Sequence, residues 1–246
     1  MKAENGKWEP VLSKAEGMDN PISILRPPFS VLNSPSSILP SPPALRRAVF
    51  LDRDGSINSM VYNSEFGLVD SPQNADQFQL LPSAPEAIRL INEMSLLAVV
   101  VSNQPGIAKG KCTPDDLEAI TQKMHRELAA GGGRLDAVYY CLHHPEALLE
   151  EYRVICDCRK PRPGLLQRAA EELGIDLGTS YMVGDGLTDV LAGKAVGCIT
   201  IFLGNHKCEL CSVIETLGAK PNFIAPSLWE AVRLIQRKES DYAYLP

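Results

Sequence analysis

Short, continuously apolar runs alternate along the chain with segments whose apolar residues recur every three or four positions. The short runs predict buried strands, because a parallel strand covered on both faces is apolar at nearly every position. The periodic segments predict amphipathic helices that pack on a sheet. Alternating strands and helices favour an α/β fold, doubly wound around a mostly parallel sheet and without a large cap domain. The expected strands are residues 48–51, 96–101, 135–140, 181–183 and 198–202.

Residues that favour helix ends mark the expected helices. Pro85 lies in the first turn of one helix, and Thr113 is an expected N-cap before a helix that Gly131 ends. Ser227 is an expected cap of the last amphipathic helix. The expected helices are residues 84–94, the segment between Thr113 and Gly131, residues 164–173, and a segment that begins after Ser227.

The first 44 residues differ from the rest of the chain. Prolines and serines interrupt them so often that no helical or strand period persists, and such a segment buries too little apolar surface to order itself. We expect a disordered extension at 1–44, one α/β domain at 45–238 and a tail at 239–246. The alternative is that part of the extension, within 22–32, packs on the domain.

Charge and cysteine content narrow the functional classes. The net charge of −6 argues against a protein that sheathes nucleic acid or an anionic membrane. No apolar run is long enough for a transmembrane helix, and the first ten residues lack the apolar core of a signal peptide. Seven unevenly spaced cysteines indicate a reducing compartment rather than a disulfide framework. We expect a cytoplasmic monomer.

Two carboxylates follow the first predicted strand of the domain. Asp52 and Asp54 are two residues apart, so both point to one side if the extended geometry persists, and Gly55 permits a sharp turn. Neighbouring anions suit phosphate chemistry only with a cation, for which Mg²⁺ is the natural choice. Asp52 would attack phosphorus, and Asp54 would protonate the leaving oxygen and later activate water. The alternative is an ordinary turn or a fragment of a calcium loop.

Further polar groups follow other predicted strands. Ser102 and Asn103 place a hydroxyl and an amide where they can donate to phosphate oxygens. Arg159 offers a planar fork for a substrate anion, and Lys160 a point charge for the transferring phosphoryl group. Asp185 would complete the protein ligands of Mg²⁺. Taken singly, each has a plainer interpretation as turn, solvated surface or helix cap; the last applies to Asp185 and Asp189.

The order of these segments carries more information than any one of them. Asp-x-Asp-Gly at 52–55, then Ser102, then Lys160, then Gly-Asp-x-x-x-Asp at 184–189 resembles the motif set of the haloacid-dehalogenase phosphatases. The resemblance implies a HAD-like Rossmannoid fold and a phosphomonoesterase that works through an aspartyl-phosphate.

Between the second and third of these motifs lies a set of metal-ligand residues. Cys141-x-His143 is followed, after residues 144–155, by Cys156-x-Cys158. Three thiolates and one imidazole form a closed tetrahedral set suited to structural Zn²⁺, and His144 could replace His143. The bound loop would hold Arg159 and Lys160 over the site. Buried or disulfide-forming cysteines are the plainer alternative.

Residues 50–58, 100–110, 140–164 and 182–189 resemble the D-glycero-D-manno-heptose-1,7-bisphosphate 7-phosphatases and their sister family, the histidinol-phosphate phosphatases. The long insert between the paired metal ligands is similar to that of the heptose type. The resemblance implies a small phosphorylated sugar as substrate, with Asp52 as nucleophile and Asp54 as acid and base. It also implies that Ser102 and Lys160 contact the phosphoryl group and that Asn103 and Arg159 contact the rest of the substrate. Mg²⁺ would be bound by Asp52, Asp185 and the Asp54 backbone carbonyl.

Departures from the family pattern bear on the substrate rather than the chemistry. Ser56 stands where threonine is usual, Gly186 where lysine is frequent, and residues 60–63 match the usual substrate loop poorly. A histidinol-phosphate phosphatase or a polynucleotide 3′-phosphatase is therefore an alternative enzyme, although 6% aromatic residues disfavour the latter. A catalytically silent binding module is the alternative of another class. In the tail, His206, Cys208 and Cys211 are too few for a second metal site and are interpreted as core or surface residues.

Overall fold

A seven-stranded sheet forms the centre of the computed structural model, which describes residues 24–25, 45–64, 67–204 and 213–243. Its strand order is β1-β6-β5-β2-β7-β8-β9, and every neighbouring pair is parallel except β1 with β6. The strands are β1 (Ile24–Leu25), β2 (Ala48–Leu51), β5 (Leu97–Asn103), β6 (Ala137–Cys141), β7 (Tyr181–Gly184), β8 (Ile199–Leu203) and β9 (Phe223–Ala225).

The strand order reverses at β2. The chain runs from β2 to β5 and β6 on one side, and then returns to β7, β8 and β9 on the other. Phe50 consequently lies opposite Val99 of β5 and Met182 of β7. In open parallel sheets, such a reversal leaves a crevice outside the carboxyl ends of the strands, where ligands bind. The residue that follows β2 lies at this point.

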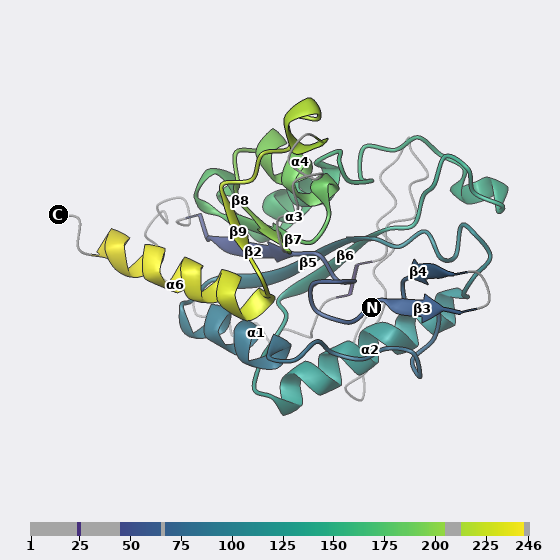
Figure 1. Ribbon diagram of the computed structural model, residues 1–246, viewed down its shortest axis with the longest axis horizontal. Helices are drawn as coiled ribbons and strands as arrows, with labels where there is room; N and C mark the ends of the chain where they lie inside the picture. The colour runs from purple at the N-terminus through teal and green to yellow at the C-terminus, as the bar shows by residue number, and fades with distance from the viewer. Residues whose placement is uncertain (1–23, 26–44, 65–66, 205–212, 244–246) are drawn as a thin grey trace, which may run out of the picture.

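Helices cover both faces of the sheet, as Figure 1 shows. Successive strand residues point to opposite faces, so Leu51 and Val100 belong to one apolar cluster, and Phe50 and Val99 to another. The first cluster includes α1 (Ala84–Glu93), α2 (Pro114–Ala130) and α6 (Leu228–Ala243), and the second includes α3 (Gly164–Leu173) and α4 (Leu187–Ala195). Two 3₁₀ turns, η1 (Glu150–Tyr152) and η2 (Leu177–Thr179), lie in the connections.

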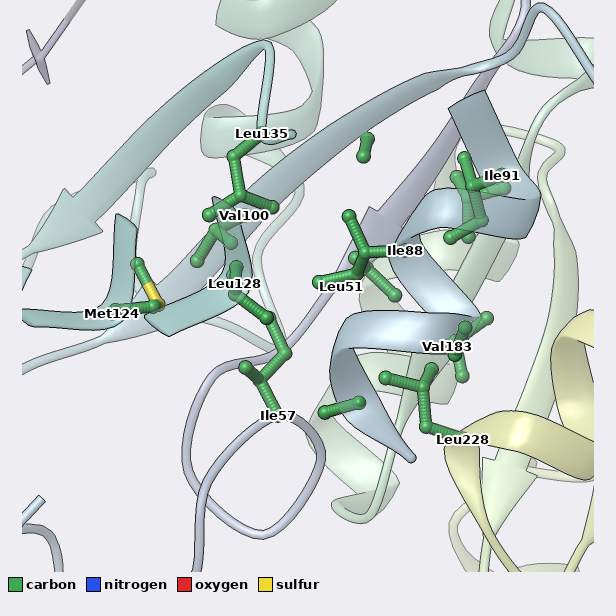
Figure 2. Packing of buried hydrophobic residues seen from close by; sticks show 14 of the residues in the cluster. Leu51, Ile57, Ile88, Ile91, Val100, Met124, Leu128, Leu135, Val183 and Leu228 are labelled. Atoms are coloured by element: carbon green, nitrogen blue, oxygen red, sulfur yellow. The ribbon is translucent and has the colours of Figure 1, made fainter. Parts of the chain in front are cut away.

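The first cluster packs α1 and α6 against the strands that lead to the site. Leu51 and Val183 lie against Ile88 and Ile91 of α1, with Leu228 of α6 beside them (Figure 2). Burying one such aliphatic side chain stabilises the fold by roughly 1.5–3 kcal/mol. Because consecutive residues of β2 pack on both faces, the strand that leads to Asp52 is anchored from two directions.

The predicted α/β fold with a mostly parallel sheet is confirmed, and the expected strands and helices agree with the observed ones to within a few residues. Thr113 caps α2 through a reciprocal pair of hydrogen bonds with Asp116, and the Ser227 hydroxyl accepts from the Glu230 amide (3.3 Å). Both caps follow the sequence prediction.

Several elements were not predicted. The hairpin of β3 (Val61–Asn63) and β4 (Leu68–Asp70) is too short and too exposed for a hydrophobic period to reveal it. The sequence analysis also missed β1, α4 and β9.

The observed boundaries at both ends differ from the predicted division of the chain. The two residues of β1 lie within the predicted extension and pair with Val138 and Tyr139 of β6. For these two residues, the pairing agrees with the alternative in which part of the extension packs on the domain. At the other end, α6 continues to Ala243, beyond residue 238, because Glu239 accepts hydrogen bonds from Arg47 and from the Tyr181 hydroxyl (2.7 Å). Within the described ranges, no helix is long and apolar enough to cross a bilayer.

Candidate active site

Three predicted segments meet at the carboxyl edge of the sheet, and a loop brings the fourth to them. Asp52 follows β2, Ser102 and Asn103 end β5, and Asp185 follows β7. The parallel register places these ends side by side, since β2 pairs with both β5 and β7. Lys160 reaches the same place from the loop before α3.

Three donors converge on one oxygen of Asp52. Its Oδ1 accepts from the Ser102 hydroxyl (2.6 Å) and the Arg53 amide (2.8 Å), and lies 3.0 Å from the Lys160 ammonium. The carboxylate is therefore fixed in one orientation. Its second oxygen, Oδ2, is the one left for a nucleophilic or cation-binding role.

The Lys160 ammonium is a buried counter-charge. Its Nζ lies 3.0 Å from Asp52 Oδ1 and 2.5 Å from Asp189 Oδ1, and donates to the Val101 carbonyl at 2.8 Å. Burial alone would lower the pKa of Lys160, but the charges of Asp189 and Asp52 outweigh it and raise the pKa. The ammonium is thus held charged beside the expected nucleophile.

Asp189 has two structural roles. Its Oδ2 accepts from the Gly186 amide (3.0 Å) at the start of α4, so the helix-capping interpretation is correct for this residue. Its Oδ1 forms the ion pair with Lys160. Burial raises the pKa of Asp189 to about 7, although Lys160 acts in the opposite direction. Much of its charge is therefore offset within the protein.

Of the three carboxylates of Asp52, Asp185 and Asp189, that of Asp185 has the negative charge that the protein offsets least. The residue is exposed at the edge of the site, while its carboxyl group is largely desolvated. This desolvation and the charge of Asp52 raise the pKa of Asp185 to about 6. A Cβ at Gly55 would lie 2.0 Å from Asp185 Oδ2, so only glycine permits this approach.

The acidic cluster fits a divalent cation. Ligand oxygens of Asp52, Asp185 and Asp189 lie within 4.8 Å of one another, and Lys160 offsets only part of their charge. Carboxylate oxygens are the ligands that Mg²⁺ prefers. Because Asp189 is engaged by Lys160 and α4, Asp52 and Asp185 are the two side chains that would hold the ion.

Asp54 points into a buried polar network that the sequence analysis missed. Arg53 contacts both carboxylate oxygens of Asp54, through Nε to Oδ1 (3.1 Å) and through Nη2 to Oδ2 (3.0 Å). Gln104 donates to Oδ2 (2.6 Å) and Asn58 to Oδ1 (2.9 Å). Burial would raise the pKa of Asp54, but the Arg53 charge and these hydrogen bonds outweigh it and lower the pKa. One signal in the sequence could have revealed this network. Arg53 lies between the two aspartates in a segment that must be buried, so its charge needs a partner.

Asn103 and Arg159 both have protein partners. Asn103 donates to the Lys160 carbonyl and accepts from the Lys160 amide, each at 3.0 Å, so it ties β5 to the lysine loop. Arg159 is half-buried and donates to the His143 carbonyl at 3.3 Å. The structure therefore gives Asn103 a supporting contact beside the role that the resemblance implied for it.

The four predicted zinc ligands lie together in a buried cluster. Cys141 Sγ is 3.3 Å from Cys158 Sγ and 3.6 Å from Cys156 Sγ, and His143 Nδ1 is 3.4 Å from Cys158 Sγ. These spacings are far longer than a disulfide bond of about 2.05 Å and near the roughly 3.8 Å between sulfurs around a tetrahedral ion. The donor set and its spacing fit a four-coordinate metal.

The structure distinguishes the two candidate histidines. His143 is fully buried and faces the thiols, whereas the Nδ1 atom of His144 accepts from the Glu146 amide. A hydrogen bond from Cys158 lowers the pKa of Cys141 to about 5, and the same contact raises that of Cys158. The predicted residues His206, Cys208 and Cys211 lie outside the described residues.

One cavity adjoins the carboxylates. It has a volume of about 490 Å³, lies on the β7 side and is bounded by Gly55, Asp185 and Leu228 of α6. The site is therefore accessible to a small ligand from the β7 side.

The fold and site together define a HAD-type phosphatase. A fixed carboxylate at the strand-order reversal, a serine on β5, a buried lysine and an acidic residue after β7 occupy the positions that the motif order predicts. A family model described as HAD-hydrolase-like matches residues 157–231.

Comparison with known proteins identifies the family. The chain is 45% identical over 197 residues to the D-glycero-beta-D-manno-heptose-1,7-bisphosphate 7-phosphatase of Pasteurella multocida, covering 80% of this chain and 100% of that protein. It is 45% identical over 148 residues to the enzyme of the same name from Escherichia coli K12, covering 60% and 73%. The chain belongs to this family of phosphatases and is a phosphomonoesterase.

A solved structure agrees with this assignment. The D,D-heptose 1,7-bisphosphate phosphatase of B. bronchiseptica, complexed with magnesium and phosphate, has a TM-score of 0.63 and 28% identity, covering 78% of this chain and 99% of that one. Magnesium and phosphate are thus bound by a protein of the same fold and family.

Proposed function

We propose that this enzyme removes the 7-phosphate of D-glycero-D-manno-heptose 1,7-bisphosphate by way of a phosphorylated Asp52. The observation that carries the proposal is the 45% identity that extends over the full length of the Pasteurella multocida enzyme of that name. The arrangement of Asp52, Ser102 and Lys160 supports the covalent route.

The first half of the reaction forms the covalent bond. Asp52 attacks phosphorus as the bond to the sugar oxygen breaks, and Asp54 gives its proton to that oxygen. Lys160 and Ser102 both contact Asp52 Oδ1, and in the proposed reaction they would stabilise charge on the phosphoryl oxygens. In the second half, Asp54 takes a proton from water as the water attacks phosphorus and frees Asp52.

We assign two metals on the basis of the donor sets. Mg²⁺ would be held by Asp52, Asp185 and the Asp54 backbone carbonyl, and when bound it would neutralise the carboxylates and polarise the phosphoryl group. Zn²⁺ would be held by Cys141, His143, Cys156 and Cys158 and would be structural, since four protein ligands leave no open position. The described cysteines are all unpaired, which supports a cytoplasmic location.

Specificity would depend on a second anionic group of the substrate. Arg159 lies one residue before Lys160, and its guanidinium can bind an anion through two parallel hydrogen bonds. A bisphosphorylated sugar has such a group, whereas histidinol phosphate does not. The metal-bound loop fixes Arg159 through the His143 carbonyl.

A substrate panel tests the proposal. We expect kcat/KM for the heptose bisphosphate to exceed that for histidinol phosphate by at least about tenfold, which is about 1.4 kcal/mol in the transition state. Arg159→Ala should reduce this preference more than it slows hydrolysis of a simple monophosphate, whereas Arg126→Ala, on the exposed face of α2, should leave it unchanged. Equal or better activity on histidinol phosphate or on a nucleic-acid 3′-phosphate would contradict the assignment.

A further inference from the structure

Arginine side chains bind both halves of the Cys and His cluster. Arg159 Nη1 donates to the His143 carbonyl at 3.3 Å, and Arg162 Nη1 donates to the Cys156 carbonyl at 2.6 Å. His143 and Cys156 are two of the four residues whose side chains would hold Zn²⁺. The family resemblance implied a substrate role for Arg159 and no role for Arg162, so the contact of Arg162 with the cluster needs an explanation of its own.

Arg162 closes a turn that carries two of the metal ligands. Its backbone amide donates to the Arg159 carbonyl at 2.9 Å, while its side chain returns to the Cys156 carbonyl. Burial raises the pKa of the Cys156 thiol, whereas a hydrogen bond from the Arg159 backbone amide acts to lower it. These contacts join the two arginines and Cys156 into a closed turn at 156–162. Cys158 and Lys160 both lie within it.

The start of this turn has less support than its middle. Asn103 binds both backbone groups of Lys160, at 3.0 Å each, and so fixes the middle of the turn to β5. Ile155, directly before Cys156, is 75% exposed, so its side chain adds little packing. The Arg162 side chain therefore binds the turn at the end where packing gives little.

The cluster also carries a charge that favours a nearby cation. Three thiolates and a neutral imidazole around a divalent ion leave one net negative charge, and all four ligand residues are buried. A buried charge is costly unless an opposite charge lies close to it. In the proposed reaction, Arg159 also binds the substrate, so its charge is shared, whereas the charge of Arg162 stays with the cluster.

We propose that Arg162 is a positioning residue of the metal cluster, which holds the 156–162 turn closed and slows the release of Zn²⁺. The inference rests on the proposed Zn²⁺ assignment. Groups that orient metal ligands without binding the metal themselves typically change metal affinity by about 10- to 100-fold. Because Arg162 is exposed and acts through a backbone carbonyl, we expect an effect at the lower end of this range.

The experiment measures how fast zinc leaves the full-length protein for an excess of a chelating dye such as pyridylazoresorcinol. Arg162→Gln removes the charge and the contact with the Cys156 carbonyl, and should release zinc about tenfold faster than the wild type. Arg162→Lys keeps the charge and can still donate one hydrogen bond, so its rate should lie between the two. The readout is metal release, so a change in catalysis alone cannot produce it.

Arg153 provides the matched control. It is also exposed, lies in the same loop, and donates from Nε to a backbone carbonyl, that of Ala147, at 2.9 Å. Ala147 is not a metal ligand, so Arg153→Gln should leave the release rate within about twofold of the wild type. Equal acceleration by Arg153→Gln and Arg162→Gln would mean that general loosening of the loop releases the metal, and would overturn the positioning role.

The remaining outcomes separate this inference from the metal assignment. If the wild type holds zinc and Arg162→Gln releases it at the wild-type rate, the positioning role alone is overturned. If the wild type, purified without a chelator, contains no zinc, the metal assignment is wrong and the inference fails with it. Should circular dichroism show that Arg162→Gln does not fold, Arg162→Met, which keeps an apolar stem and cannot donate, replaces it with the same expected rate.

Discussion

At the scale of single residues, the site carries more negative charge than the protein neutralises. Asp52, Asp185 and Asp189 converge at one point, and Lys160 is the counter-charge that contacts two of them. Desolvation by burial, together with the nearby charge of Asp52, disfavours the ionised form of Asp185 and raises its pKa. A site that binds a cation and then a phosphate gains from this imbalance, because the ligands supply the missing interactions.

Asp52→Asn should abolish turnover without unfolding the protein. The amide keeps the size of the side chain but cannot act as the nucleophile. We expect kcat to fall below about one hundredth of the wild-type value, as measured by phosphate release with circular dichroism as the check on folding. Asp115→Asn, on an exposed turn of α2, is the matched control and should retain full activity. A variant of Asp52 that keeps more activity would exclude the covalent route.

Asp185→Asn should change the pH dependence of stability when magnesium is removed. The folded pKa of about 6 is above the unfolded value of 3.8, so the folded state binds more protons between them. Its contribution to stability is therefore present below about pH 4 and is lost as pH rises through about 6. The variant should gain in melting temperature over the wild type at pH 7.5 more than at pH 4, by a small amount because the residue is exposed.

The effect of magnesium on the same variant provides a control. Magnesium should stabilise the wild-type protein at pH 7.5 and stabilise Asp185→Asn much less, because a carboxylate ligand is missing. Thermal melts in EDTA and in magnesium at both pH values measure the effect. Identical pH dependence of the two proteins in EDTA would show that Asp185 is not held in a repulsive environment.

At the scale of elements, the loop between β6 and α3 joins the buried Cys and His cluster to the candidate active site. Cys158 lies two residues before Lys160, and Arg162 Nη1 donates to the Cys156 carbonyl at 2.6 Å. Several large apolar side chains of this loop are exposed, among them Leu148 and Ile155, so packing alone gives it little support. A metal held by the four Cys and His side chains would add the support that packing does not give.

Cys156→Ser should therefore reduce both metal content and phosphate affinity. We expect the wild-type protein to carry one zinc per chain, and the variant to lose most of it together with several degrees of melting temperature, since ligand binding contributes directly to folding. Elemental analysis and thermal melts are the measurements. Cys198→Ala removes a buried thiol outside the cluster and should keep the zinc. Wild-type protein without zinc, when purified without a chelator, would contradict the ligand assignment.

At the scale of the whole molecule, stabilising contacts and the candidate catalytic groups lie at opposite edges of the sheet. At the amino end of the strands, Arg47 and the Tyr181 hydroxyl both bond to Glu239 of α6, and Arg46 bonds to the Leu173 carbonyl. At the carboxyl end lie the carboxylates of the site. Figure 1 shows how α6 runs across the sheet beside α1. This separation allows the site to remain electrostatically unfavourable while the fold is held from the other edge.

Deleting residues 1–44 should affect stability slightly and catalysis hardly at all. The described part of this segment, β1, pairs only two residues with β6. Each hydrogen bond contributes about 1 kcal/mol net, so we expect a change of at most a few degrees in melting temperature and kcat/KM within about twofold of the full chain. A larger fall in melting temperature would mean that the segment forms part of the domain.

The sequence by itself determined the central strands, the main helices and the candidate site residues that meet at the edge of the sheet. Strands buried on both faces must be apolar throughout, and Asp52, Ser102, Lys160 and Asp185 recur in a recognisable order, so both signals are local and survive without structure. The Cys and His spacing likewise predicted a cluster that the structure brings together.

Only the tertiary structure decided which groups face one another. The contacts among Arg53, Asp54 and Gln104 join residues 51 positions apart, and the ion pair of Lys160 with Asp189 joins the loop before α3 to the first turn of α4. Local pattern cannot reveal such pairs, because a buried charge is tolerated only through its partner. The choice of His143 over His144 follows for the same reason: both lie beside the motif, and only the fold turns one of them toward the thiols.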